Sequence, residues 1–225
     1  MSKTLIAATL AACAAVMAAG CNGNRGDAPV AATEGHAPPT EAAASAEETA
    51  PLEAGDRVPA ARVKDMEGRT LDLSQVVAER PAVIVFYRGG WCPYCTIHLG
   101  ELATAEPRLV ELGYQVLALS PEPPQKVAET GEEGGFRYQL LSDSETEAAR
   151  GFGVAFKVDE ATAQRYQEGG IDLGTAPGIE RRLLPVPSVF VAGTDGVVKF
   201  AHADPDYRVR LEPEQILTAA ERAVE

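Results

Sequence analysis

Two continuous apolar runs predict strands that are buried on both faces. Residues 82–87 (AVIVFY) and 114–120 (YQVLALS) are rich in β-branched and aromatic side chains and show little alternation with polar ones, which is typical of strands inside a sheet. A helix is predicted between them, because Pro93 suits a first helical turn and Gly113 ends the pattern. The apolar positions of this helix are Ile97, Leu99, Leu102, Leu109 and Leu112.

The rest of the chain continues the alternation of strand and helix. The pattern predicts helices over residues 123–130, 144–151 and 212–224, and strands over residues 138–141, 188–192 and 197–202. Residues 193–196 (GTDG) are a good hairpin turn between the last two strands. Glycines 169, 170, 174 and 178 predict an irregular insertion over residues 154–184, around a short helix at 159–168. We therefore expect an α/β fold with a central mixed sheet flanked by helices.

The N-terminal segment has the pattern of an export signal. Lys3 is followed by the apolar stretch 5–19 and by small residues up to Cys21, so residues 1–20 are predicted to be a cleaved signal peptide. The ending Ala18-Ala19-Gly20-Cys21 resembles the lipobox of bacterial lipoproteins, although that family usually has Leu, Val or Ile where Ala18 stands. The resemblance implies a lipidated Cys21 at the mature N-terminus and an exported protein of the cell envelope that faces the periplasm. Plain secretion is the alternative.

A low-complexity segment follows the predicted signal. Ala, Pro and Glu make up most of residues 22–54, and none of these residues is aromatic. Such a composition buries too little apolar surface to offset the entropy of ordering the chain. We therefore expect residues 21–54 to be a disordered tether and residues 55–225 to be one folded domain.

Charge and cysteine content narrow the function. The chain has 20 Lys and Arg against 33 Asp and Glu, a net charge of −13, and no basic run. A nucleic-acid partner is therefore not expected, and membrane contact is expected only through the lipid anchor. Of the four cysteines, Cys13 leaves with the signal and Cys21 is blocked by lipid. The mature protein thus keeps two thiols, Cys92 and Cys95.

These two cysteines form a Cys-Pro-Tyr-Cys motif directly after a buried strand and at the start of a helix. Two intervening residues let the sulfurs form a disulfide across one helical turn. The unpaired N–H groups and the dipole of the helix N-terminus favour a thiolate, which is the nucleophilic form of cysteine. Arg88 either adds positive potential or is a solvated loop residue. The motif therefore predicts a redox-active disulfide that needs no cofactor.

Two structural interpretations of the motif are weaker. A structural zinc site needs four ligands, and only His98 and His202 could complete a set, so no metal is expected. A purely structural disulfide suits an oxidising compartment, but a bond across two residues closes too small a loop to constrain the unfolded chain much. Redox chemistry is the stronger interpretation.

Residues 86–95 (FYRGGWCPYC) resemble the active-site segment of peroxiredoxin-like proteins of the alkyl hydroperoxide reductase and thiol-specific antioxidant group. The resemblance extends through residues 184–188 (LPVPS) and 204–207 (DPDY) and covers about residues 56–220. It implies a thioredoxin-like fold, a thiol active site, and a hydroperoxide or disulfide substrate. An external dithiol reductant of the thioredoxin type would then restore the two thiols.

The chain also departs from this group at its reactive positions. Peroxiredoxins typically carry Pro-x-x-x-Thr/Ser-x-x-Cys, in which the last residue attacks the peroxide. On that pattern Cys95 takes the attacking place, Cys92 replaces Thr/Ser, and Arg88 replaces Pro. The arginine of the family falls approximately on Pro187. Thioredoxins instead attack with the first cysteine, here Cys92.

Further residues are expected around the pair, and the place of Pro187 among them is implied by a resemblance to thioredoxins. Thioredoxins carry a cis-proline opposite the cysteine pair, and Pro187, just before the strand 188–192, fits that place. Trp91 is expected to pack beside Cys92 and to form part of the groove around it. Tyr94 is expected at an exposed loop tip, and His98 on the surface of its helix. Asp204, Asp206 and Tyr207 are interpreted as a structural polar turn.

Three functions follow from this reading. The first is a thiol-dependent peroxidase, in which a thiolate attacks a hydroperoxide and the resulting sulfenic acid is resolved to the Cys92–Cys95 disulfide. The second is a thioredoxin-like oxidoreductase that exchanges disulfides with proteins. The third is a non-catalytic, lipid-anchored binding module. Overall likeness to the family favours the first.

Overall fold

The computed structural model describes residues 41–171, 173, 175–176, 179–180 and 182–223. The chain divides into two units, residues 1–32 and 33–225, and every described residue belongs to the second. The predicted signal peptide 1–20, Cys21 and the first half of the predicted tether lie outside the described residues. Within the part of the chain that is described, no helix is both long enough and apolar enough to cross a membrane.

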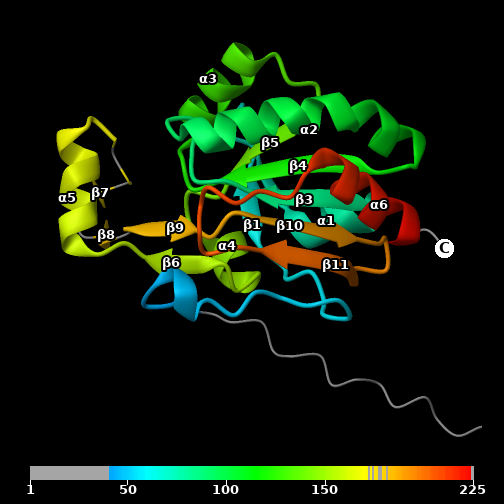
Figure 1. The fold of residues 1–225 in the computed structure, drawn as a ribbon, viewed down its shortest axis with the longest axis horizontal. Coiled ribbons are helices and arrows are strands. Elements are labelled where there is room, and N and C mark those ends of the chain that lie inside the picture. The colour runs from blue at the N-terminus through cyan, green and yellow to red at the C-terminus, as the bar shows by residue number, and fades with distance from the viewer. Residues whose placement is uncertain (1–40, 172, 174, 177–178, 181, 224–225) are drawn as a thin grey trace, which may run out of the picture. The chain divides into compact units, whose positions relative to one another are not determined.

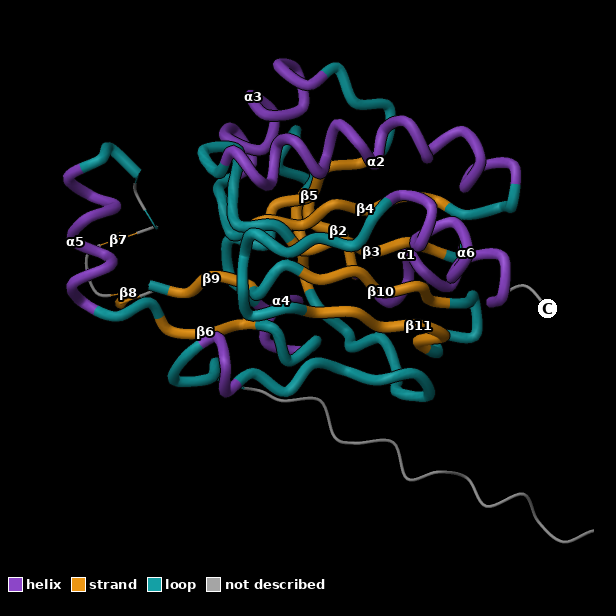
Figure 2. The backbone as a smooth tube through the Cα atoms, in the orientation of Figure 1, coloured by secondary structure: helices purple, strands orange, loops and turns teal. Residues whose placement is uncertain are grey.

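A seven-stranded mixed sheet forms the centre of the described unit, in the order β11-β10-β3-β4-β5-β1-β2 (Figures 1 and 2). β3 (Ala82–Phe86), β4 (Gln115–Ser120) and β5 (Gln139–Ser142) are parallel. β10 (Ser188–Ala192) runs antiparallel to β3, and β11 (Val198–Ala203) forms one edge. The hairpin of β1 (Arg62–Lys64) and β2 (Thr70–Asp72) forms the other edge.

Helices cover both faces of this sheet, because successive side chains of a strand point to opposite faces. Val83, Val85 and Tyr87 of the β3 segment share a core with α2 (Pro93–Glu111), α3 (Pro124–Gly134) and α6 (Pro213–Ala223). Ala82, Ile84 and Phe86 share the opposite core with α1 (Leu73–Glu79) and α4 (Glu147–Gly151). The long helix α2 lies along one face of the sheet in Figure 1.

An insertion between α4 and β10 extends beyond the end of the sheet (Figure 1). β6 (Ala155–Lys157) pairs with β9 (Leu183–Pro185) to form its base. Between them lie α5 (Glu160–Glu168) and the short pair β7 (Thr175–Ala176) and β8 (Ile179–Glu180). The insertion predicted over residues 154–184 is therefore a two-stranded ribbon that carries a helix.

The expected α/β architecture is confirmed, and so are both buried strands and the helix that begins at Pro93. Two assignments on that helix were wrong. Ile97, predicted on its apolar face, is 61% exposed, whereas His98, predicted on the surface, is only 5% exposed. The buried face instead follows Cys95, His98, Leu99 and Leu102.

The second half of the predicted tether is ordered against the domain. Ala43 pairs with the base of the insertion, donating to the Ala155 carbonyl at 2.9 Å and accepting from Lys157 N–H at 2.9 Å. A short 3-10 helix, η1 (Ala46–Glu48), follows. Leu52 is 2% exposed and its N–H donates to the Phe152 carbonyl at 3.0 Å. The predicted tether boundary at Ala54 was therefore wrong, and we call residues 43–54 the N-terminal strap.

The burial of Leu52 gives a test of the strap. Leu52→Ala is expected to lower the free energy of unfolding by about 2–3 kcal/mol, because it removes a buried side chain from the core. Urea unfolding followed by far-UV circular dichroism measures the change. Glu53→Ala, at the exposed neighbouring position, is the matched control and should stay within about 0.5 kcal/mol of wild type. An unchanged Leu52→Ala protein would mean that the strap contributes nothing to stability.

Candidate active site

The two cysteines lie where the chain passes from the end of β3 into α2. Cys92 is the N-cap residue of α2, and its carbonyl accepts from Cys95 N–H at 2.9 Å and from Thr96 N–H at 3.1 Å. Gly89 has a φ of +152° and lies against the indole of Trp91, where an added Cβ would collide with the ring. Gly89 therefore allows the tight approach of the loop to Trp91.

Both sulfurs are enclosed, with Cys92 2% and Cys95 1% exposed. The Cys95 thiol donates a hydrogen bond to the Cys92 sulfur, and this contact is the main reason that the pKa of Cys92 falls to about 6. Burial opposes the shift, while the Cys95 N–H and the charges of Arg88 and Arg210 support it. The pKa of Cys95 is raised, because its thiol donates to Cys92 and is buried. Near neutral pH the pair therefore carries one thiolate, on Cys92.

Arg88 is a buried member of the site. It is 5% exposed, and its guanidinium carbon lies 4.3 Å from the ring centroid of Tyr207, 5.1 Å from that of Trp91 and 5.5 Å from that of Tyr166. Its Nη2 donates to the Tyr166 hydroxyl. Aromatic faces attract a cation without neutralising it, and Arg88 forms no ion pair with a described carboxylate. The interpretation of Arg88 as a solvated loop residue was therefore wrong.

Arg210 is the site residue that the sequence did not reveal. Its Nη2 lies 3.4 Å from the sulfur of Cys95, although 115 positions separate the two residues. It follows the polar turn at 204–207, in which Asp206 N–H donates to Asp204 Oδ1 at 2.8 Å. The only sequence signal was the DPDY resemblance, which marked this segment as part of the family pattern without pointing to an arginine.

The other predicted site residues fall around the pair. Pro187 precedes Ser188, which pairs with Phe86 at the end of β3, so it stands opposite the motif as expected. No peptide bond between described residues is cis, so the expected cis-proline was wrong. Trp91 packs against Tyr166 with ring centroids 5.2 Å apart. Tyr94 is exposed, as predicted, and contacts Tyr207 edge-on, with the two ring centroids 5.7 Å apart.

His98 is neither a surface residue nor a partner for the thiolate. Its Nε2 lies 3.1 Å from the Leu211 carbonyl, and burial lowers its pKa to about 4. The imidazole is therefore neutral at pH 7 and helps to hold the 204–211 segment against α2. Among the described residues, no group of three or more His, Cys, Asp or Glu side chains is arranged to hold a metal.

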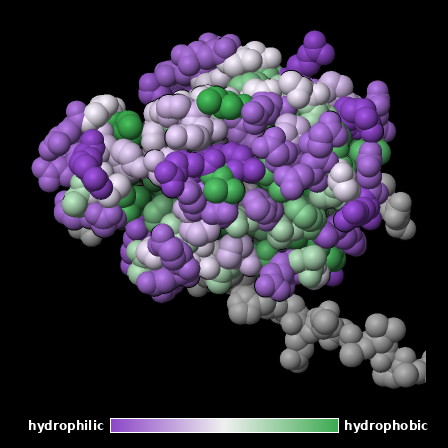
Figure 3. Space-filling view, viewed as in Figure 1, coloured by the Kyte–Doolittle hydropathy of each residue, from purple (hydrophilic) through white to green (hydrophobic). Residues whose placement is uncertain are grey.

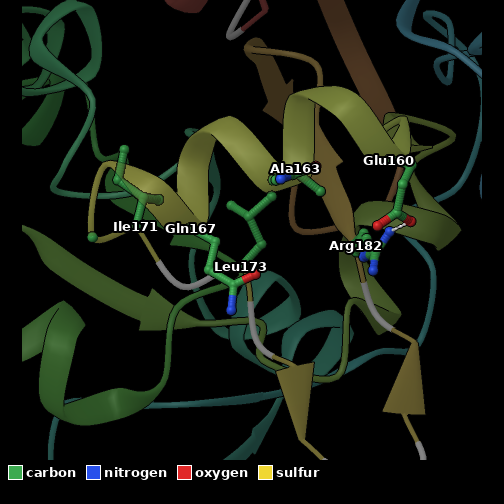
Figure 4. A pocket seen from close by; sticks show the side chains of 8 residues that line it. Glu160, Ala163, Gln167, Ile171, Leu173 and Arg182 are labelled. Atoms are coloured by element: carbon green, nitrogen blue, oxygen red, sulfur yellow. Dashed lines mark hydrogen bonds and ion pairs between the residues drawn. The ribbon is translucent and has the colours of Figure 1, made fainter.

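The two sides of α5 face different hollows. Thr162 and Tyr166 line a pocket of about 300 Å³ together with Arg88, Pro187 and Tyr207. Residues 44–47 of the strap, together with Phe156, Val158 and Leu184, form part of its walls. Ala163 and Gln167 instead line a second hollow of about 450 Å³, beside which Glu160 pairs with Arg182 (Figure 4). The first hollow is the one lined by Arg88 and Pro187 of the site.

The site and the sheet together define a thioredoxin-fold domain with a thiol centre. Comparison with known proteins identifies the family: residues 54–201 match the AhpC/TSA family, and the chain belongs to it. The peroxiredoxin Bcp of Escherichia coli (strain K12) is 30% identical over 104 residues, which are 46% of this chain and 66% of that protein. A putative peroxiredoxin of Mycobacterium tuberculosis is 29% identical over 160 residues, which are 68% of this chain and 86% of that protein.

Solved structures agree on the fold. Peroxidoxin BcpB from Mycobacterium tuberculosis superposes with a TM-score of 0.57 at 23% identity and covers 76% of this chain and 97% of that one. Reduced Prx3 from Vibrio vulnificus gives a TM-score of 0.60 at 16% identity, over 76% and 98% of the two chains. The thioredoxin-like fold expected from the sequence is thus confirmed.

The charge distribution on the pair can be measured by titration. In a full chain with Cys13→Ser and Cys21→Ser, thiolate absorbance at 240 nm should rise with a midpoint near pH 6, with the thiolate present above that pH and lost below it. Cys95→Ala should raise this midpoint, because the hydrogen bond to the Cys92 thiolate is removed. Cys92→Ser should abolish the step. A midpoint at about 8.5 with both thiols present, as in free cysteine, would contradict a thiolate on Cys92 that the Cys95 thiol stabilises.

Proposed function

We propose that this protein is a thiol-dependent peroxidase that reduces hydroperoxides through the Cys92–Cys95 pair. The observation that carries the proposal is an enclosed pair of sulfurs at the start of α2, with Arg210 Nη2 3.4 Å from Cys95. Neither Arg210 nor the buried Arg88 forms an ion pair with a described carboxylate, and both lower the pKa of Cys92. Membership of the AhpC/TSA family and the peroxiredoxin relatives support it.

The proposed reaction has two steps. The Cys92 thiolate attacks one oxygen of the hydroperoxide, so that an S–O bond forms and the O–O bond breaks. The leaving alkoxide takes a proton from solvent and departs as the alcohol, or as water from hydrogen peroxide. Cys95 then loses its proton to solvent. The Cys95 thiolate then attacks the sulfenic acid on Cys92; a disulfide forms, and hydroxide leaves and is protonated by solvent. An external dithiol, of the thioredoxin type, reduces the disulfide.

The order of attack departs from the family pattern. That pattern places Cys95 at the attacking position, but the hydrogen bond between the sulfurs and the N-cap position of Cys92 both favour a thiolate on Cys92. The same order is used by thioredoxin-like oxidoreductases. A protein disulfide is therefore the second candidate substrate, and the exposed Tyr94 and Ile97 beside the motif favour contact with a protein. The lowered pKa of Cys92 argues against a non-catalytic binding module.

Reaction with hydrogen peroxide separates the two catalytic functions. Trp91, the single tryptophan, packs beside the pair and should report oxidation by its fluorescence after rapid mixing. Ionisation alone makes a thiol with a pKa near 6 about 30-fold more reactive at pH 7 than free cysteine. We expect a rate well above that factor, and a sulfenic acid trapped on Cys92 in Cys95→Ser.

Each outcome of this experiment has a distinct meaning. A rate no greater than about 30 times that of free cysteine would mean that nothing besides ionisation promotes the reaction, and would contradict the peroxidase. Rapid reduction of a protein disulfide by the same sample would then establish the thioredoxin-like function. A fast reaction that survives in Cys92→Ser with a sulfenic acid on Cys95 would keep the peroxidase and reverse the order of attack.

We further propose that the protein is exported to the cell envelope, faces the periplasm and is anchored through a lipid on Cys21. The signal-like pattern of residues 1–20 and the Ala-Ala-Gly-Cys ending support this placement. In a bacterial host that processes lipoproteins, Cys21→Ser should move the protein from the membrane fraction to the soluble fraction. Cys13→Ser, within the predicted signal, is the matched control and should remain with the membrane. An unchanged distribution of Cys21→Ser would contradict the anchor.

A further inference from the structure

Arg210 is held beside Cys95 by contacts on both sides of it along the chain. On one side, Val209 N–H donates to the Asp206 carbonyl at 2.9 Å, and Arg208 turns outward to pair with Asp206 at 2.7 Å. On the other side, Leu211 is buried, and its carbonyl is 3.1 Å from His98 Nε2 on α2. The backbone is therefore fixed on either side of Arg210 while its side chain reaches Cys95.

The guanidinium of Arg210 has unused hydrogen-bonding capacity. Its Nε and Nη1 are buried and have no hydrogen-bond partner, and it forms no ion pair with a described carboxylate. The charge of Arg210 lowers the pKa of Asp206, but both oxygens of that carboxylate already accept hydrogen bonds from Arg208. In the resting pair the Cys92 thiolate is the anion near Arg210, and a buried cation that loses its counter-charge is unfavourable. Its position is explained if an anion forms next to it during the reaction.

Cys95 is the group that must become this anion. In the resting pair its proton is retained by the hydrogen bond to the Cys92 thiolate. The other groups that face it are the Arg88 backbone N–H and the Tyr87 hydroxyl, which burial keeps neutral. Once Cys92 is oxidised, its negative charge is gone and the two arginines lack an anion. Cys95 then has to lose its proton before it can attack Cys92.

We propose that Arg210 is a catalytic residue of the second, disulfide-forming step, in which it stabilises the Cys95 thiolate as that sulfur attacks the oxidised Cys92. This inference rests on the proposed cycling of the pair between dithiol and disulfide, but not on the identity of the oxidant. Arg210 lies beyond residue 201, where the match to the family ends. Its role is inferred from its contact with the Cys95 sulfur and from its buried nitrogens that have no partner. In the step the S–S bond forms, the bond from Cys92 to its leaving group breaks, and the leaving group departs with the electron pair.

The first test measures the ionisation of Cys95 directly and needs no oxidant. In a full chain with Cys13→Ser, Cys21→Ser and Cys92→Ser, Cys95 is the remaining thiol, and its thiolate absorbance at 240 nm is titrated. Arg210→Gln should raise the midpoint by about one pH unit or more. Arg210→Lys keeps the charge, so its midpoint should stay close to that of the protein with Arg210. Arg208→Gln, which removes the exposed neighbouring arginine, should leave the midpoint unchanged.

The second test separates the two chemical steps in single-turnover reactions. With hydrogen peroxide, or with an aromatic disulfide reagent that releases a coloured thiolate at each step, Arg210→Gln should slow the second step about tenfold at pH 7, the factor that one pH unit implies. The first step should change less than about twofold, because Cys92 stays mostly ionised at that pH. Arg210→Lys should largely restore the second step.

Either test can overturn the inference. An unshifted Cys95 midpoint in Arg210→Gln, an equal shift in Arg208→Gln, or an unaltered second step would show that Arg210 is only structural. If Arg210→Gln fails to fold, Arg210→Met, which keeps the apolar stem, takes its place in both tests. A protein that reacts with the aromatic disulfide but not with peroxide would contradict the peroxidase and still decide the role of Arg210.

Discussion

The hydrogen bond from the Cys95 thiol to the enclosed sulfur of Cys92 sets the requirements that the rest of the site meets. Enclosure disfavours a charged sulfur, so the thiolate on Cys92 needs donors that do not depend on water. The Cys95 thiol and N–H supply two of them, and both become available because α2 begins at Pro93. The central strand β3 in turn fixes where α2 begins, since it ends at Phe86, just before the glycine loop. The sheet, the loop and the helix start therefore act together as one support for the sulfur pair.

The electrostatics of the site differ from those of the whole molecule. The chain carries a net charge of −13, and hydrophilic side chains predominate on the face drawn in Figure 3. The cysteine pair nevertheless faces two guanidinium groups, and charges within a few ångströms outweigh distant ones that water screens. Arg88 is held by aromatic rings rather than by a carboxylate. A carboxylate paired with Arg88 would have cancelled the effect of its positive charge on the cysteines, whereas the aromatic rings leave that effect in place.

The features that could be predicted from sequence are those that local patterns encode. β3, β4, β10 and the start of α2 have strong apolar runs or a proline signal, and all were predicted correctly. The cysteine pair and the place of Pro187 also followed from short motifs. Arg210 could not be predicted, because its contact with Cys95 depends on how the segment after β11 folds back onto α2. His98 was misjudged for the same reason, since its partner is the carbonyl of Leu211. The strap was not predicted, because its alanine-rich sequence shows no pattern of its own and becomes ordered only by pairing with the β6–β9 ribbon.

The strap also bears on how the protein should be divided. Residues 44–47 form part of the wall of the pocket next to Arg88, and Leu52 belongs to the core beneath α4. A shortened protein that starts at Gly55, the domain boundary suggested by composition, would remove that wall and expose the apolar surface that Leu52 covers. Such a fragment would present a wider opening beside Arg88 than the native chain does, and the environment of this arginine would differ from that in the native protein. A soluble version that preserves the native enclosure has to retain the chain from Glu41 onward.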